Sequence, residues 1–96
     1  MVAYLPQPKE GERFVDIAPF KVDGPRAYAD LIFDKIDETV LAHSSYIALA
    51  RNRAEIEANK RADKKSLMIG IENGLALEDD LKNVEHFAKR GIVYIT

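Results

Sequence analysis

The sequence predicts an α/β fold in which parallel β-strands alternate with α-helices. Two observations carry this prediction. Apolar runs and amphipathic stretches follow one another in the order strand, helices, strand, helix, strand, which is typical of βαβ units with right-handed crossovers. The central run, Ser66 to Ile71, is apolar almost throughout, as expected for a parallel strand buried on both faces. With 96 residues the chain is long enough for one small domain.

The chain starts with one predicted strand and a long irregular segment. Val2 to Leu5 form a short apolar run that Pro6 closes. Residues 6–24 contain a short apolar segment from Phe14 to Phe20 but no clear period. A loop of this length in a small domain indicates either a functional segment or an element that the pattern does not reveal.

Two helices are predicted before the central strand. Pro25 suits the first turn of a helix, which we expect to end near Ala42 or His43. Asn52 and Glu55 have the spacing of a capping box and indicate a second, shorter helix at the surface. The long helix carries its apolar positions at three- and four-residue spacing: Tyr28, Leu31, Ile32, Ile36 and Val40.

The last third of the chain combines the central strand with a further helix and a closing strand. Residues 79–90 form an amphipathic pattern, and Gly91 can adopt the left-handed conformation that ends helices. Residues 92–96 are apolar and read as a strand, so about three parallel strands are expected in all. The helix is expected to pack one side against the sheet: Leu81, Val84, Phe87 and Ala88.

Composition excludes several classes of function. The net charge is −2 with no basic face, which argues against nucleic acid or an anionic membrane as partner. The absence of cysteine excludes disulfides, thiolate zinc sites and a cysteine nucleophile. No apolar run approaches the roughly 18 residues of a membrane-spanning segment. The cellular compartment is not indicated by any of these features.

Glu72 is the principal candidate for chemistry. It follows the central strand and precedes Asn73 and Gly74, a pair that favours a tight turn. The carboxyl ends of parallel strands are where α/β enzymes place their catalytic groups, so this carboxylate is a candidate metal ligand or general base. Two other readings stay open from position alone: a solvent-exposed glutamate that opens a turn, and a hairpin with Asn-Gly at its tip.

Other candidate residues are better explained by structure than by chemistry. His86 lies beside apolar helix positions and is expected at a surface or boundary, while His43 is expected at a helix C-terminus, which favours a cation. The two histidines do not have metal-ligand spacing, and no nucleophile elbow or phosphate-binding glycine motif occurs. The four tyrosines are expected to be packing residues with a polar tip: Tyr4, Tyr28, Tyr46 and Tyr94.

Residues 67–96 resemble the renal-type (membrane) dipeptidase family of zinc peptidases. The matching pieces are Gly70-Ile71-Glu72-Asn73-Gly74, similar to the family's Gly-x-Glu-Gly-Gly, and residues 91–96, similar to its Gly-x-x-Tyr-x-Thr. Asn73 departs from the commoner glycine. Weaker similarity extends upstream to residues 4–7, the long helix and residues 49–51, so that the resemblance covers most of the chain.

The resemblance implies a (β/α)₈ barrel with a two-zinc site at the carboxyl ends of its strands. It implies that Glu72 bridges the two zinc ions, which would share an activated water that hydrolyses a dipeptide. The family's other ligands, a His-x-Asp pair and two further histidines, have no counterpart here, and His43 and His86 match none of them. A barrel of this class needs about 250 residues. We therefore expect residues 1–96 to be a single partial domain, with barrel strands two to four, and to be inactive in isolation.

Two alternatives remain at this point. The chain could be a stand-alone, non-catalytic α/β module that interacts through its open strand edges. A stand-alone domain is expected to end in a loop or a capped helix, so the apolar run 92–96 at the end of the sequence counts against this alternative. It could also belong to a barrel with related amidohydrolase-type metal chemistry, which substrate screening would distinguish. In either case the open edges lead us to expect self-association of the isolated chain.

Overall fold

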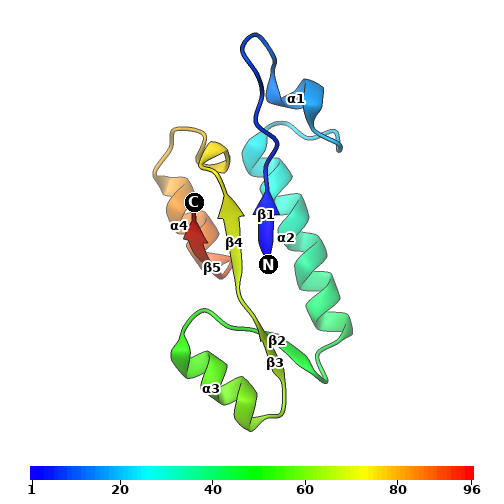
Figure 1. Ribbon diagram of the computed structural model, residues 1–96, viewed down its shortest axis with the longest axis vertical. Coiled ribbons are helices and arrows are strands. Elements are labelled where there is room, and N and C mark those ends of the chain that lie inside the picture. The colour runs from blue at the N-terminus through cyan, green and yellow to red at the C-terminus, as the bar shows by residue number, and fades with distance from the viewer.

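The computed structural model describes all 96 residues and confirms the α/β class with parallel strands (Figure 1). Five short strands alternate with helices, and a single-turn 3₁₀ helix, η1, follows β4. No helix combines the length and the apolar character needed to cross a membrane. In chain order the elements are β1 Val2–Tyr4, α1 Phe14–Ile17, α2 Pro25–Ala42, β2 Ile47–Leu49, α3 Arg53–Arg61, β3 Lys65–Leu67, β4 Ile69–Glu72, η1 Leu75–Leu77, α4 Lys82–Lys89 and β5 Ile92–Ile95.

The strands form two parallel sheets rather than the single three-stranded set that we expected. One sheet has the order β1-β4-β5 and the other pairs β2 with β3. The predicted central strand is divided at Met68 into β3 and β4. Its first part pairs with β2 through Leu49 and Leu67, and its second part pairs with β1 through Ala3 and Ile71. One continuous run therefore pairs in parallel with three strands: β2 through its first part, and β1 and β5 through its second part.

The helices largely follow their predicted boundaries, with one clear difference. Asn52 caps α3 as expected, because its Oδ1 accepts a hydrogen bond from the Glu55 amide at 2.9 Å. The last helix begins at Lys82 and not at residue 79. Glu78 and Asp79 have left-handed backbone conformations, with φ of 50° and 57°, and these are incompatible with a continuous α-helix.

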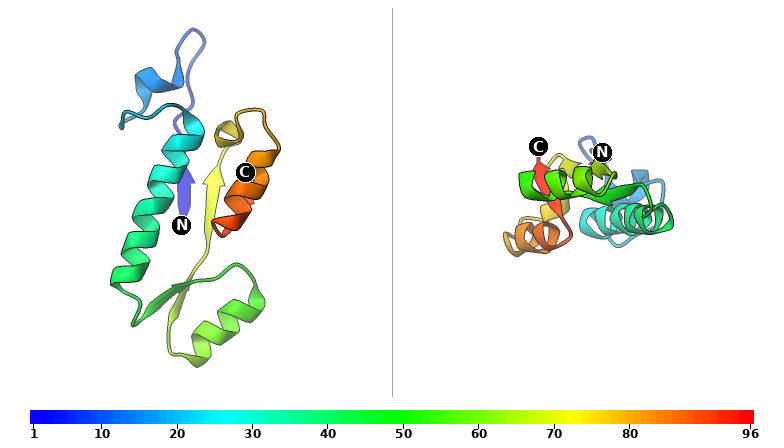
Figure 2. Two further views of the ribbon diagram at one scale, coloured as in Figure 1. Left: turned by 180° about the vertical axis from the view of Figure 1, so that it is seen from behind. Right: turned by 90° about the horizontal axis from the view of Figure 1, so that it is seen from below.

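The hydrophobic core lies between one face of the three-stranded sheet and the pair α2 and α4. Figure 2 shows both helices in front of the strands when the molecule is seen from behind. Ile69 and Ile71 of β4 are fully buried on this face. Phe33 of α2 and Phe87 of α4 meet edge to face above them, with ring centroids 5.9 Å apart.

Two details of the predicted helix faces are wrong. The stripe proposed for the long helix omitted Phe33, which is the most buried large residue of α2. Of the four residues placed on the packed side of the last helix, only Phe87 is buried. The other three are exposed, with Leu81 at 83% and Val84 at 44%: Leu81, Val84 and Ala88. Because α4 starts only at Lys82, Leu81 precedes the helix and does not share the direction of Phe87.

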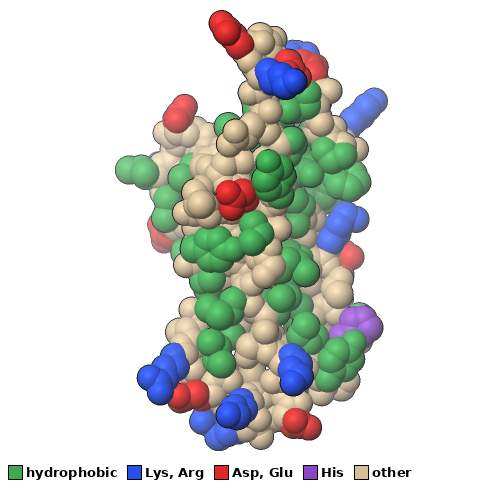
Figure 3. Space-filling model, viewed as in Figure 1, with side chains coloured by type: hydrophobic (Ala, Val, Ile, Leu, Met, Phe, Trp, Pro, Cys, Tyr) green, Lys and Arg blue, Asp and Glu red, His purple; other side chains and the backbone are tan.

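The opposite face of the three-stranded sheet is not covered by a helix. Val2, Tyr4 and Tyr94 are exposed there, and Figure 3 shows hydrophobic side chains gathered over the strands on this side. The molecule measures 50 × 25 × 18 Å with a radius of gyration of 14.9 Å. A compact chain of this length would have a radius of gyration of about 12.5 Å. The long axis of the molecule runs from the loop that carries α1 to the separate unit of β2, β3 and α3 at the other end (Figure 1).

On the outer side of the core, one guanidinium joins α2 to α4. Arg90 donates hydrogen bonds to Asp30 at 3.2 Å, Asp34 at 2.7 Å and Asp37 at 3.1 Å, and it lies over the Phe33 ring at 5.7 Å. Burial acts to lower the pKa of Arg90, but the hydrogen bond to Asp34 and the charges of the three aspartates raise that pKa above its ordinary value. Arg90 therefore stays charged throughout the neutral range and loses its stabilising effect only as the pH rises through that elevated pKa.

We expect Arg90→Ala to lower the free energy of unfolding by about 1–3 kcal/mol, because it removes charge-assisted hydrogen bonds whose donor is only 20% exposed. Urea unfolding followed by circular dichroism measures the change. Arg53→Ala, which removes an exposed pair with Glu57, is the matched control and should cost less than about 0.5 kcal/mol. Equal effects of the two substitutions would contradict a specific role of Arg90 between the helices.

Candidate functional site

Glu72 is the last residue of β4, at the carboxyl edge of the parallel sheet. Its partner in register on β1 is Tyr4, the last residue of that strand. Side chains alternate along β4: Ile69 and Ile71 point into the core, so Glu72 points to the uncovered face. The structure thus places the carboxylate at the strand tip that the sequence predicts.

The half-buried Glu72 carboxylate makes no hydrogen bond or ion pair with the rest of the chain, unlike those of Glu55 and Glu78. Two phenol rings share its face of the sheet. Tyr4 lies opposite it on β1 and is 66% exposed, and Tyr94 lies on β5 beside Gly70. The arrangement is a lone carboxylate, free to accept hydrogen bonds or to bind a cation, with aromatic side chains on both neighbouring strands.

Gly70 allows Tyr94 to lie flat against the backbone of β4. The two residues are in register across β4 and β5, and a Cβ at position 70 would overlap the Tyr94 ring. A glycine inside a strand is unfavourable unless another group comes close to its backbone, which is the case here. Gly70 is therefore a packing requirement of the face that carries Glu72.

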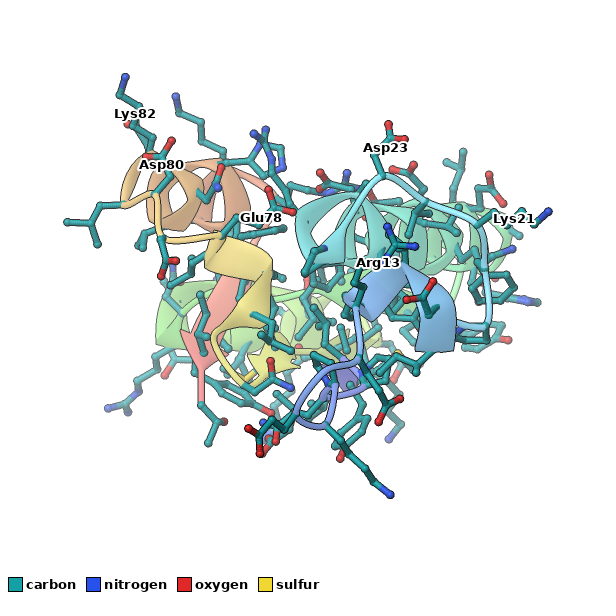
Figure 4. The ribbon with its side chains drawn as sticks, turned by 90° about the horizontal axis from the view of Figure 1, so that it is seen from above. Arg13, Lys21, Asp23, Glu78, Asp80 and Lys82 are labelled. Carbon is teal, nitrogen blue, oxygen red and sulfur yellow. The ribbon has the colours of Figure 1, made fainter.

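The turn after Glu72 is fixed by side chains. Asn73 has a left-handed φ of 68°, donates from Nδ2 to the Leu5 carbonyl at 2.8 Å and accepts at Oδ1 from the Leu75 amide at 3.0 Å. Farther along, Glu78 accepts from the Arg26 amide at 3.1 Å and so caps α2, whose own cap residue, Gly24, has no side chain. In the view from above, Glu78 lies between η1 and the start of α2 (Figure 4).

Gly24 is required by this cap. A Cβ at position 24 would lie 2.8 Å from Oε1 of Glu78, which is closer than van der Waals contact allows. The loop after β4 is thus anchored to β1 at one end and to the first turn of α2 at the other.

The two histidines lie away from Glu72. His86 is half-buried between α2 and α4, where its Nε2 is 2.8 Å from the Asp30 carboxylate and its Nδ1 is 3.3 Å from Arg26. This agrees with the prediction of a boundary position. His43 follows the last turn of α2, and its ring lies against Tyr46 with centroids 5.5 Å apart. The structure brings neither histidine to the carboxyl edge of the sheet.

The donor set at this edge does not make a zinc site by itself. No three His, Cys, Asp or Glu side chains lie close enough together to hold a metal ion. A zinc site needs three or four protein ligands, and Glu72 is a single carboxylate. The residues of this chain alone therefore do not fit the two-zinc centre, although one of them has a suitable donor and position.

Sequence reasoning did not single out Tyr4, Tyr94 or Asn73 as parts of the site. The signal for the tyrosines was present: the strand period of two places Tyr4 on the face of Glu72 once β1 and β4 are paired in parallel. Asn73 could have been singled out because asparagine tolerates the left-handed backbone conformation that a tight turn requires. The pairing partners of each strand were the missing information.

A parallel sheet with helices on one face and a free carboxylate at its carboxyl edge defines an α/β protein of the kind that builds active sites from strand tips. Comparison with known families narrows this class. Residues 23–96 match the family described as membrane dipeptidase (peptidase family M19), and the chain belongs to that family. The family is one of dipeptidase-like metallopeptidases, and it is zinc-dependent in general. No curated protein matches the chain.

We expect Gly70→Ala to destabilise the chain by about 1–3 kcal/mol, because the added methyl group must displace the Tyr94 ring. Thermal or urea unfolding measures the change. The double variant Gly70→Ala, Tyr94→Ala should recover part of the loss. Gly74→Ala is the matched control, since nothing lies within 4 Å of a Cβ there, and it should be close to neutral. Additive effects at positions 70 and 94 would show that the two residues do not depend on each other.

Proposed function

We propose that residues 1–96 are one part of a zinc-dependent dipeptidase barrel, in which Glu72 supplies a carboxylate that bridges two zinc ions. The observation that supports this most directly is the place of Glu72: at the carboxyl tip of a parallel strand, on the uncovered face, inside the segment that matches the dipeptidase family. In a (β/α)₈ barrel, strand tips of this kind surround the active site.

The uncovered face corresponds in this proposal to the inside of the barrel. Helices surround a (β/α)₈ barrel, and α2 and α4 cover only one face of the sheet here. The free edges of β1 and β5 would then pair with further strands, and the exposed apolar residues Val2 and Tyr94 would join the barrel interior. The other zinc ligands would come from those strands, together with the groups that bind the dipeptide.

The total exposed surface of the chain is larger than that of a compact monomer, and the uncovered face contributes to it together with the extended shape. The chain exposes 6597 Å². A compact monomer of the same mass would expose about 5,500 Å². The surplus of about 1,100 Å² exceeds the roughly 800 Å² that one partner buries in a standard interface.

The free edges of β1 and β5 favour a second candidate function, a non-catalytic module that docks through these edges. Both proposals require that the uncovered face be occupied, and they differ in whether the Glu72 carboxylate is needed for function.

A related amidohydrolase-type activity would keep the role of Glu72 and change only the substrate. A screen of amide substrates beside dipeptides separates such an activity from dipeptidase activity.

The decisive experiment transfers the segment into an active enzyme. We expect a dipeptidase of this family in which residues 70–96 replace the equivalent segment to retain zinc and dipeptide hydrolysis. Glu72→Gln in that chimera should lower kcat/KM by about 100-fold or more, because an amide is a weaker metal ligand than a carboxylate. Hydrolysis assays and zinc content measure the effect.

Glu85→Gln is the matched control, since this glutamate forms an exposed pair with Lys89 on α4. It should leave the activity of the chimera unchanged. The isolated 96-residue chain should hold no stoichiometric zinc and hydrolyse no dipeptide. Tight zinc binding with hydrolysis by the isolated chain would contradict the proposal that it is a partial domain.

We expect the isolated chain to self-associate, because β1 and β5 both have free edges next to exposed apolar side chains. Sedimentation velocity over a range of concentrations measures this. Val2→Lys should shift the population toward the monomer, since a lysine on an edge strand opposes edge pairing. Lys9→Ala, in the exposed segment before α1, should have no effect. A sharp monomer at all concentrations would refute the expectation.

A further inference from the structure

The side chain of Asn73 extends the β1–β4 ladder beyond its last backbone pair. The ladder begins where the Gly70 amide donates to the carbonyl of Met1, and its last paired residue on β4 is Glu72. Beyond that point the Leu5 carbonyl accepts a hydrogen bond from Asn73 Nδ2 at 2.8 Å. A side-chain amide therefore joins the two strands where the backbone of β4 turns away.

The same side chain also stabilises the turn. Asn73 Oδ1 accepts from the Leu75 amide at 3.0 Å, and asparagine is one of the few residues that tolerate a φ of 68°. A glycine at this place would satisfy the backbone but could form neither hydrogen bond. The asparagine therefore supplies two contacts next to Glu72 that a glycine would not provide.

The distal end of the loop is held independently of Asn73. Glu78 caps α2, and the buried Asn83 donates to the Leu77 carbonyl at 2.8 Å. These anchors fix the path from η1 to α4 but lie five or more residues beyond Glu72. Asn73 is the anchor adjacent to the carboxylate.

We propose that Asn73 is the positioning residue for Glu72, because its amide bridges the carboxyl ends of β1 and β4 and fixes the backbone from which the carboxylate projects. Functional groups must be held within about 0.5 Å of their working positions by the residues that support them. That a well-ordered Glu72 side chain matters for chemistry rests on the proposed function. The order itself is a property of the 96-residue chain and can be measured without metal or substrate.

The test compares Asn73→Gly and Asn73→Asp in the isolated chain by NMR. Asn73→Gly keeps the left-handed backbone and loses both hydrogen bonds. Asn73→Asp keeps the acceptor for Leu75 but cannot donate to the Leu5 carbonyl when ionised. We expect both variants to raise hydrogen exchange of the Glu72 amide up to about tenfold beyond any change in global unfolding, and to lower the order parameter of the Glu72 Cγ methylene.

Asn59→Ala is the matched control at the other end of the molecule. It removes an asparagine amide that donates to the Leu49 carbonyl at 3.2 Å and to the Ser66 hydroxyl at 3.0 Å. It should lower global stability, measured by urea unfolding, without any change at the Glu72 methylene.

Unchanged order at Glu72 in both Asn73 variants would overturn the positioning role. An equal loss of order in Asn59→Ala would overturn it as well, since the effect would then be general loosening. An inactive Glu72-containing chimera, with Asn73-dependent order intact in the isolated chain, would refute the proposed function and leave the positioning role standing.

Discussion

The burial of one face of β4 under α2 and α4 is the interaction on which the rest of the structure depends. Ile69 and Ile71 are fully buried, and truncation of such a side chain typically costs about 2–5 kcal/mol. Because the strand period is two, the same packing that buries the isoleucines forces Gly70 and Glu72 to the other face. The position of the candidate ligand is thus a consequence of core packing, and Tyr94 can approach the sheet only because position 70 has no side chain.

The sequence was sufficient for the elements with a clear period or a clear boundary signal. Pro25 marked the start of the long helix, and Asn52 and Glu55 marked the start of α3, because capping is decided by neighbouring residues. The strand tip at Glu72 was also predictable, since an apolar run followed by Asn-Gly leaves few options. Membership in the dipeptidase family agrees with the resemblance drawn from the residues around that tip.

Other features depend on tertiary contacts that no local pattern records. The four residues of α1 and the three of β2 are too short to show a period. The division of the central strand at Met68 depends on which strand pairs with each half, and that is a property of the whole fold. The late start of α4 follows from the left-handed residues Glu78 and Asp79, of which the first is held by the amino end of α2. The metal role proposed for Glu72 has no local signature either, because no three possible metal ligands lie together in these 96 residues.

The Asn73-Gly74 turn also makes the strand tip a candidate site of asparagine deamidation. In an asparagine followed by glycine, the backbone nitrogen of the glycine attacks the side-chain carbonyl most easily, because glycine offers no steric hindrance. The attack expels ammonia, and water then opens the resulting imide to aspartate or isoaspartate. In the folded chain, the hydrogen bonds to Leu5 and Leu75 hold the amide in place and oppose that attack. Once deamidation occurs, a carboxylate faces the Leu5 carbonyl and adds a negative charge beside Glu72. The hydrogen bonds of the folded chain thus protect the Asn73 side chain from a reaction to which the unfolded chain is open.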